Sequence, residues 1–158
     1  MFQNILVPLD GSEVGEAALP YVEKLVSKLA PGVKVGVTLF QVLSPTHYVV
    51  AGEAAAPVPY IEAEMEQLRK RAMDYLNKAA EELRSRKVSV ECKVAIGSAA
   101  EEINKTACEI NADLVAMSTH GRSGFSRWAF GSVTDKVLRG GNRPVLLVRA
   151  QERAEKEQ

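Results

Sequence analysis

Short apolar segments alternate along this chain with longer segments in which apolar residues recur every three or four positions. Uniformly apolar short segments are typical of strands buried in a parallel sheet, and the longer periodic segments are typical of amphipathic helices. We expect strands at about 3–9, 34–43, 88–95, 113–118 and 143–149. We expect helices at about 12–30, 60–87, 98–110 and 132–139. The alternation predicts the α/β class, with a doubly wound, five-stranded parallel sheet and four helices.

Capping patterns mark where three of the expected helices begin. An aspartate or serine followed three residues later by an acidic residue is the pattern of a capping box. The three pairs are Asp10 with Glu13, Ser98 with Glu101, and Ser132 with Asp135. We therefore expect a helix to start at each of these places.

The expected strand order places a crevice at one point of the sheet. A chain that winds outward from the first strand to the third, and restarts with the fourth strand on the other side, gives the order 3-2-1-4-5. Ligands of such sheets bind beyond the carboxyl ends of the strands, where the winding reverses. The candidate rim residues are Pro8, Leu9 and Asp10 after the first strand and residues 118–121 after the fourth.

A glycine-rich stretch, 117–132, connects the fourth strand with the last helix. Glycine accepts positive φ and has no side chain, so such a loop can turn several backbone N–H groups toward one anion. Gly121, Gly131 and Ser132 are candidate phosphate-binding residues, because a helix start favours an anion. The alternative is that Ser132 caps the helix and that the glycines merely turn the chain.

Several other side chains near the crevice are candidates for ligand contacts. Asp10 suits a ribose hydroxyl or a divalent cation such as Mg²⁺ that bridges phosphates, and its alternative role is to cap the first helix. His120 and Arg122 lie beside the loop glycine and suit a phosphate, although a structural or exposed role fits each equally well. Val37 and Leu39 either border an adenine pocket or pack in the core.

The remaining segments bear on domain organisation. Residues 1–150 are expected to form a single domain, and the charged tail 151–158 is expected to be disordered. A segment rich in proline and alanine, 44–59, has no periodicity and is expected to be a mobile flap.

Composition narrows the choice of partners and compartment. The chain has 158 residues, with 20 basic and 20 acidic side chains, and this zero net charge disfavours nucleic acid and anionic membranes as partners. It shows no signal-peptide pattern and no apolar run near the roughly 20 residues that span a bilayer, so we expect a cytoplasmic protein. Cys92 and Cys108 are expected to be buried, reduced thiols.

Common catalytic signatures are absent from the sequence. There is no G-x-x-x-x-G-K-[ST] loop, no G-x-G-x-x-G after the first strand and no G-x-S-x-G elbow. Carboxylates stand at the strand exits, but no general base accompanies them. The residues do not indicate an enzyme.

Taken together, five motifs resemble those of the universal stress protein family, and the likeness runs over residues 1 to about 150. They are ILVPLDGS at 5–12, AIGS at 95–98, DLVAMSTHGR at 113–122, GSVTDKVLR at 131–139 and PVLLV at 144–148. The resemblance implies a Rossmann-like fold of the HUP type.

The resemblance also implies a nucleotide site. In the ATP-binding branch of the family the loop reads G-x2-G-x9-G-[ST]. Gly121, Gly131 and Ser132 match this pattern, whereas Ser118 replaces the first glycine. By resemblance, adenine and ribose lie near Pro8, Asp10 and Val37, and the phosphates lie against Gly121, Gly131, Ser132, Val133 and Thr134. The other residues expected to bind the nucleotide are Leu9, Gly97, Ser118, His120 and Arg122. The bound ligand would be ATP or AMP, with Mg²⁺ possible at Asp10.

The function implied by the resemblance is that of a stress-response sensor or regulator controlled by adenine nucleotide. The family commonly forms homodimers through the last strand, here 145–148, and an uncovered apolar edge strand would favour the same pairing. Two alternatives stay open. One is a slow ATPase or nucleotidyl-transfer enzyme, and the other is a dimeric interaction module with a vestigial pocket.

Overall fold

The computed structural model describes residues 3–29, 34–44, 58–119 and 131–150. Its strands are β1 (Asn4–Pro8), β2 (Gly36–Leu43), β3 (Ser89–Ile96), β4 (Leu114–Thr119) and β5 (Val145–Arg149). Its helices are α1 (Glu13–Glu16), α2 (Leu19–Ser27), α3 (Val58–Ser85), α4 (Ala99–Glu109) and α5 (Ser132–Gly140). Most of the predicted flap and of the glycine-rich loop, and all of the tail, lie outside the described residues.

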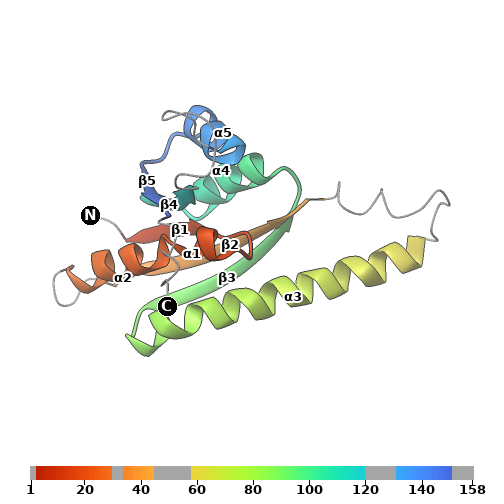
Figure 1. Ribbon diagram of the computed structural model, residues 1–158, viewed down its shortest axis with the longest axis horizontal. Helices are drawn as coiled ribbons and strands as arrows, with labels where there is room; N and C mark the ends of the chain where they lie inside the picture. Colours follow the sequence, from red (N-terminus) through yellow and green to blue (C-terminus); the bar gives the residue numbers. More distant parts are fainter. Residues whose placement is uncertain (1–2, 30–33, 45–57, 120–130, 151–158) are drawn as a thin grey trace, which may run out of the picture.

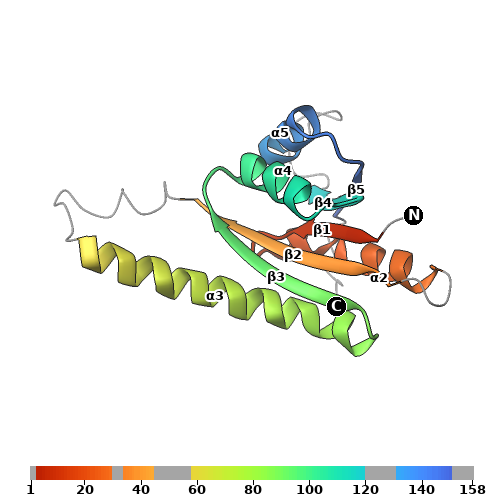
Figure 2. The ribbon, with the colours of Figure 1, turned by 180° about the vertical axis from the view of Figure 1, so that it is seen from behind.

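The described strands form one parallel sheet in the order β3-β2-β1-β4-β5. Figures 1 and 2 show α2 and α3 on one face of this sheet and α4 and α5 on the other. The doubly wound, Rossmann-like fold and its strand order are therefore confirmed. In this order β3 and β5 form the two edges of the sheet.

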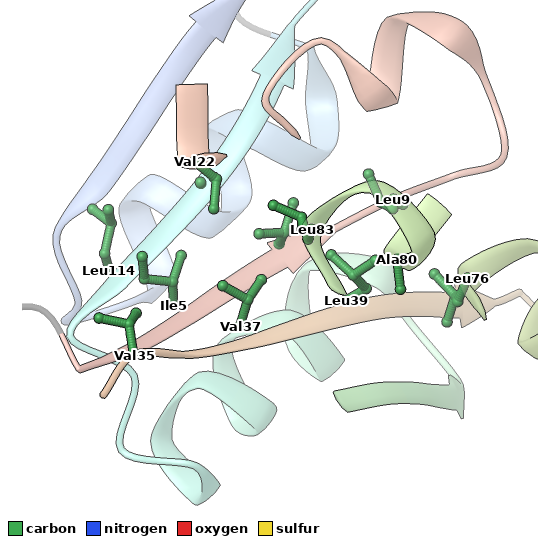
Figure 3. Packing of buried hydrophobic residues seen from close by; sticks show 12 residues of the cluster. Ile5, Leu9, Val22, Val35, Val37, Leu39, Leu76, Ala80, Leu83 and Leu114 are labelled. Carbon is green, nitrogen blue, oxygen red and sulfur yellow. The ribbon is translucent and has the colours of Figure 1, made fainter. Parts of the chain in front are cut away.

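Two apolar clusters fill the spaces between the sheet and its helices. The cluster under α2 and α3 includes Ile5, Leu39 and Leu76, each 0% exposed, and is drawn in Figure 3. The cluster under α4 and α5 is built around Phe40 and Val115. Neighbouring residues of a strand point to opposite faces, so Leu39 and Phe40 enter different clusters.

The space at the centre of the sheet arises where β1 and β4 separate. β1 pairs with β2 along its whole length, up to Pro8 opposite Phe40. Its pairing with β4 stops earlier, with Leu6 opposite Val115, although β4 continues to Thr119. The carboxyl ends of β1 and β4 therefore diverge at the point where the winding reverses.

The first predicted helix, 12–30, is divided into α1 and α2. Pro20 lies in the first turn of α2, and it has no N–H to donate to the carbonyl four residues earlier, so one continuous helix does not form. Ser12 is the N-cap of α1, and its hydroxyl oxygen accepts a hydrogen bond from the Gly15 N–H at 3.0 Å. The prediction that Asp10 caps this helix is therefore wrong.

The other two predicted capping boxes are also wrong, although both helices begin where expected. Ser98 is the N-cap of α4 and Gly131 is the N-cap of α5, and among the described residues no side chain accepts a capping hydrogen bond at either helix. Ser132 is the first residue of α5 instead of its cap. Within the described part of the chain, the first-turn N–H groups of both helices are consequently without a side-chain acceptor.

Helix α3 is the longest helix in the described part of the chain, and Figures 1 and 2 show its first half extending beyond the sheet. Its second half packs on the sheet through Leu76, Ala80 and Leu83. None of the described helices combines the length and apolarity needed to cross a bilayer.

The two cysteines differ in exposure. Cys92 on β3 is half-buried, and burial raises the pKa of its thiol. Cys108 on α4 is exposed, with its Sγ 3.8 Å from Asn142 Oδ1. The prediction of a buried thiol is therefore wrong for Cys108, because this residue lies on the outward side of α4 while the preceding Ala107 points into the core.

Candidate functional site

A cavity of about 260 Å³ lies at the carboxyl ends of β1, β2 and β4. Nine of its lining residues were predicted from the sequence: Pro8, Leu9, Asp10, Ser118, Thr119, Gly131, Ser132, Val133 and Thr134. The others are Gly15, Phe40, Val42, Ala99, Ile103 and Met117. Residues far apart in the sequence thus meet at the predicted crevice. His120, Gly121 and Arg122 lie outside the described residues.

Val37 does not line this cavity, contrary to the prediction. It is 1% exposed and packs with Ile5 and Leu39 in the cluster under α3 (Figure 3). Phe40 and Val42 lie an odd number of positions along β2 from Val37, so their side chains point to the opposite face, where the cavity is. β2 therefore borders the cavity through Phe40 and Val42 and borders the core under α3 through Val37.

Gly97 is also absent from the cavity lining. Its N–H donates to the Leu43 carbonyl oxygen at 3.0 Å, and a Cβ at this position would lie 3.0 Å from Glu102 Cγ. Within the described residues, Gly97 therefore serves the close junction between β3 and α4.

Asp10 is held in place by the turn that follows β1. Its Oδ1 accepts hydrogen bonds from the Ser12 N–H at 3.0 Å and from the Ser12 hydroxyl at 2.6 Å. Its Oδ2 forms no hydrogen bond to any other described residue. One carboxylate oxygen thus fixes the side chain, and the other is free to accept a hydrogen bond from a ligand in the cavity.

The start of α5 forms the second polar part of the cavity. Gly131, Ser132, Val133 and Thr134 all line it, and the absence of a side-chain cap in the described structure leaves first-turn N–H groups for a ligand. These groups and the positive end of the helix dipole attract an anion. Gly131 has φ −58° and ψ 153°, so its glycine identity is not required by the backbone conformation.

The remaining wall is apolar. Phe40, Ile103 and Met117 are 2%, 3% and 5% exposed, and they form a surface together with Val42 and Ala99. A flat aromatic group suits such a surface. None of these residues was predicted as part of the site. For Ala99 alone the sequence held a signal, because this residue directly follows the matched junction at 95–98.

Behind Asp10, on the α3 side, lies a group of buried polar atoms. Tyr75 Oη and Gln41 Oε1 are buried without a hydrogen-bond partner among the described residues. Burial raises the pKa of Tyr75, and the carboxylates of Glu16 and Asp10 raise it further. The phenol is therefore neutral at physiological pH.

The described residues offer no ready-made metal centre. No three His, Cys, Asp or Glu side chains gather there in a way that would hold an ion. A divalent cation at Asp10 would consequently depend on oxygen ligands brought by a bound molecule, as phosphates do for Mg²⁺.

Comparison with known proteins identifies relatives along the whole chain. Universal stress protein MJ0577 of Methanocaldococcus jannaschii is 28% identical over 159 residues, covering 94% of this chain and 96% of that protein. Universal stress protein YxiE of Bacillus subtilis is 28% identical over 149 residues, covering 94% of this chain and 100% of that protein.

Solved structures share the fold. The structure of MJ0577 has a TM-score of 0.78 at 27% identity, covering 97% of this chain and 99% of that chain. A universal stress protein family protein from Arabidopsis thaliana, solved with AMP bound, has a TM-score of 0.61 at 14% identity, covering 94% of this chain and 92% of that chain. The family model described as the universal stress protein family matches residues 1–149. This chain therefore belongs to the universal stress protein family.

Proposed function

We propose that the cavity binds an adenine nucleotide, ATP or AMP, and that the protein acts as a stress-response sensor or regulator whose state depends on this ligand. The observation that carries the proposal is the arrangement of three chemically different surfaces along one cavity. These are an apolar wall, a free carboxylate oxygen and an uncapped helix start.

The sheet order supports a direction for the ligand. Phe40 and Val42 belong to β2, Asp10 follows β1, and α5 follows β4, and these strands are neighbours in the order β2-β1-β4. A nucleotide whose base lies on the apolar wall would place its ribose at Asp10 and its phosphates at Ser132 of α5. Apolar area contributes affinity for the base, and the helix start selects the anion.

The comparisons add to this argument. The AMP-bound relative from Arabidopsis shares the fold, and Gly131 and Ser132 match the end of the phosphate-loop pattern of the ATP-binding branch. We further propose that the protein works in the cytoplasm without catalysing a reaction. We also propose that it forms a homodimer through β5, an edge strand whose residues Val145 to Leu147 are only half-buried.

The experiment that tests nucleotide binding compares Gly131→Asp with Gly131→Asn. A Cβ at Gly131 meets no described atom within 4 Å, so both variants should fold, and they differ chiefly in one negative charge. The purified protein is denatured, released nucleotide is identified by chromatography, and the emptied protein is titrated calorimetrically with ATP, AMP and adenosine.

We expect the wild-type protein to bind all three ligands. Gly131→Asp should weaken ATP and AMP at least tenfold more than Gly131→Asn does, because its carboxylate repels the phosphates, and it should leave adenosine nearly unchanged. The titrations are carried out once with Mg²⁺ and once with EDTA, and the difference shows whether a divalent cation contributes to nucleotide affinity. If the wild-type protein releases no nucleotide and gives no binding heat, the proposal is rejected. The remaining interpretation would then be a dimeric interaction module with a vestigial pocket.

A further inference from the structure

Ser118 lies at the end of β4 and is joined by its hydroxyl to the turn that follows β1. Its Oγ donates a hydrogen bond to the Gly15 carbonyl oxygen at 2.6 Å, across 103 positions of sequence. The bond is partly buried, and both residues line the cavity. Glycine at position 118 would lack this bond.

The geometry limits what Ser118 can do for a ligand. A hydroxyl has a single proton to donate, and here that proton is directed to Gly15. A phosphate oxygen is an acceptor, so Ser118 does not donate to it while the bond to Gly15 persists. The side chain therefore acts on the protein and not directly on an anion.

Gly15 is in turn connected to Asp10. The Gly15 N–H donates to Ser12 Oγ at 3.0 Å, and the Ser12 hydroxyl donates to Asp10 Oδ1 at 2.6 Å. Residue 15 is thus held from two sides: Ser118 on β4 bonds its carbonyl oxygen, and its N–H is linked through the Ser12 hydroxyl to the Asp10 carboxylate that lines the cavity. The carbonyl and the N–H of Gly15 belong to different peptide units, so these bonds act by fixing the position of residue 15 and of the turn that orients Asp10.

We propose that Ser118 is a positioning residue that holds the α1 turn against β4 and thereby directs Asp10 Oδ2 toward the ribose of a bound nucleotide. The inference rests on the proposed nucleotide function and assigns a role to the one motif position that departs from the family pattern. In this chain, the serine hydroxyl fixes the position of the α1 turn before a ligand binds. A glycine at position 118 has no hydroxyl and cannot form this bond.

The test uses Ser118→Ala and Ser118→Gly, which lack the hydroxyl, and Ser118→Thr, which retains it. Ser85→Ala is the matched control, because Ser85 Oγ donates to the Glu82 carbonyl oxygen at 2.7 Å on α3, away from the cavity. Each variant is titrated with ATP, AMP and adenosine, alone and combined with Asp10→Asn. Hydrogen exchange of the Ser12 and Gly15 amides is measured without ligand.

We expect Ser118→Ala and Ser118→Gly to weaken all three ligands to the same extent, about three- to tenfold, on the scale of one neutral hydrogen bond. Ser118→Thr and Ser85→Ala should bind as the wild-type protein does. In the Asp10→Asn background, loss of the hydroxyl should cause no further weakening. The Ser12 and Gly15 amides should exchange faster in Ser118→Ala and Ser118→Gly only.

Three results would overturn the inference: a loss confined to ATP and AMP, an undiminished loss in the Asp10→Asn background, or unchanged exchange of the two amides. The first would mean a direct phosphate contact. If the wild-type protein binds none of the three ligands, the proposed function fails, while the exchange measurement still decides whether Ser118 holds the turn.

Discussion

Asp10 occupies the space that a side chain at position 15 would need. A Cβ atom placed on Gly15 overlaps Asp10 Oδ1, and its next nearest neighbours, at 3.3 and 3.4 Å, are Cγ and the backbone nitrogen of the same aspartate. Gly15 is therefore glycine because of the carboxylate, and not because of its own backbone, since its φ is not positive.

Gly15→Ala tests this relationship. In a helix, alanine in place of glycine normally stabilises by up to about 1 kcal/mol. Here we expect a loss of about 1–2 kcal/mol in the free energy of unfolding, because the new methyl group displaces Asp10 from Ser12. Urea denaturation measures this change. Gly131→Ala, which meets no described atom, should stay within about 0.5 kcal/mol of wild type. If Gly15→Ala were more stable than wild type, a side chain at position 15 would not displace Asp10.

The two faces of β2 predict opposite outcomes for two valines. Val37→Ala should cost about 2–3 kcal/mol of stability and leave nucleotide affinity unchanged, because Val37 lies in the core. Val42→Ala should cost less stability and weaken ATP, AMP and adenosine alike by roughly tenfold, because the lost methyl groups belong to the cavity wall on which we propose that the base lies. Calorimetry measures the affinities of both variants, and urea denaturation measures their stabilities. Equal affinities for Val42→Ala and wild type would show that the base does not bind against Val42.

Acid stability should depend on Asp113. Its Oδ2 accepts hydrogen bonds from the Gln3 N–H at 2.8 Å and the Asn4 N–H at 3.0 Å, and these bonds lower the pKa of the carboxyl. A lowered folded-state pKa gives stability that is complete above the ordinary value near 3.8 and is lost as the pH falls from there through the folded-state value.

Asp113→Asn should remove this part of the pH dependence. We expect the variant to be less stable than wild type at pH 7 and the difference to shrink between about pH 4 and pH 2. Urea midpoints measured across that interval provide the comparison. A constant difference at every pH would show that the charge of Asp113 is not involved.

Alkaline stability should depend on Tyr75 with the opposite sign. Burial, assisted by Glu16 and Asp10, raises the pKa of this phenol, so stability is complete below the ordinary tyrosine value of about 10 and is lost as the pH rises above it. Tyr75→Phe should unfold less readily than wild type above pH 10. At pH 7 it should lie within about 0.5 kcal/mol of wild type, since Tyr75 Oη makes no hydrogen bond of good geometry among the described residues, although Glu16 lies near enough to raise the pKa of the phenol. If wild type and Tyr75→Phe lost stability equally as the pH rose above 10, this prediction would be contradicted.

Much of the site was predictable because it depends on strand ends. With the strands in the order β3-β2-β1-β4-β5, Asp10 follows β1, Ser118 lies at the end of β4 and Ser132 begins the helix after β4, so the three come to the point where these neighbouring strands end. The Pro20 signal was also present in the sequence, since proline in a helical pattern marks a break, but the apolar periodicity around it suggested one helix.

Other features depend on tertiary contacts that hydropathy does not encode. β2 carries apolar residues on both of its faces, so its pattern does not say whether Val37 or Val42 borders a cavity. The choice of Ser12 over Asp10 as the cap, in the sequence Asp10-Gly11-Ser12-Glu13, follows from the three-dimensional course of the turn. The bond from Ser118 to Gly15 joins distant segments and has no local signature.

Asp10 belongs to the first turn of the chain and Ser132 to its last helix, with the sheet between them. During synthesis, a nascent chain that has emerged only as far as β3 carries Asp10 but has neither β4 nor α5. Any ligand of this cavity must therefore wait until translation has passed the last helix and the two halves have packed together. Occupancy then requires that both halves of the described fold have packed together, and it opposes their unfolding.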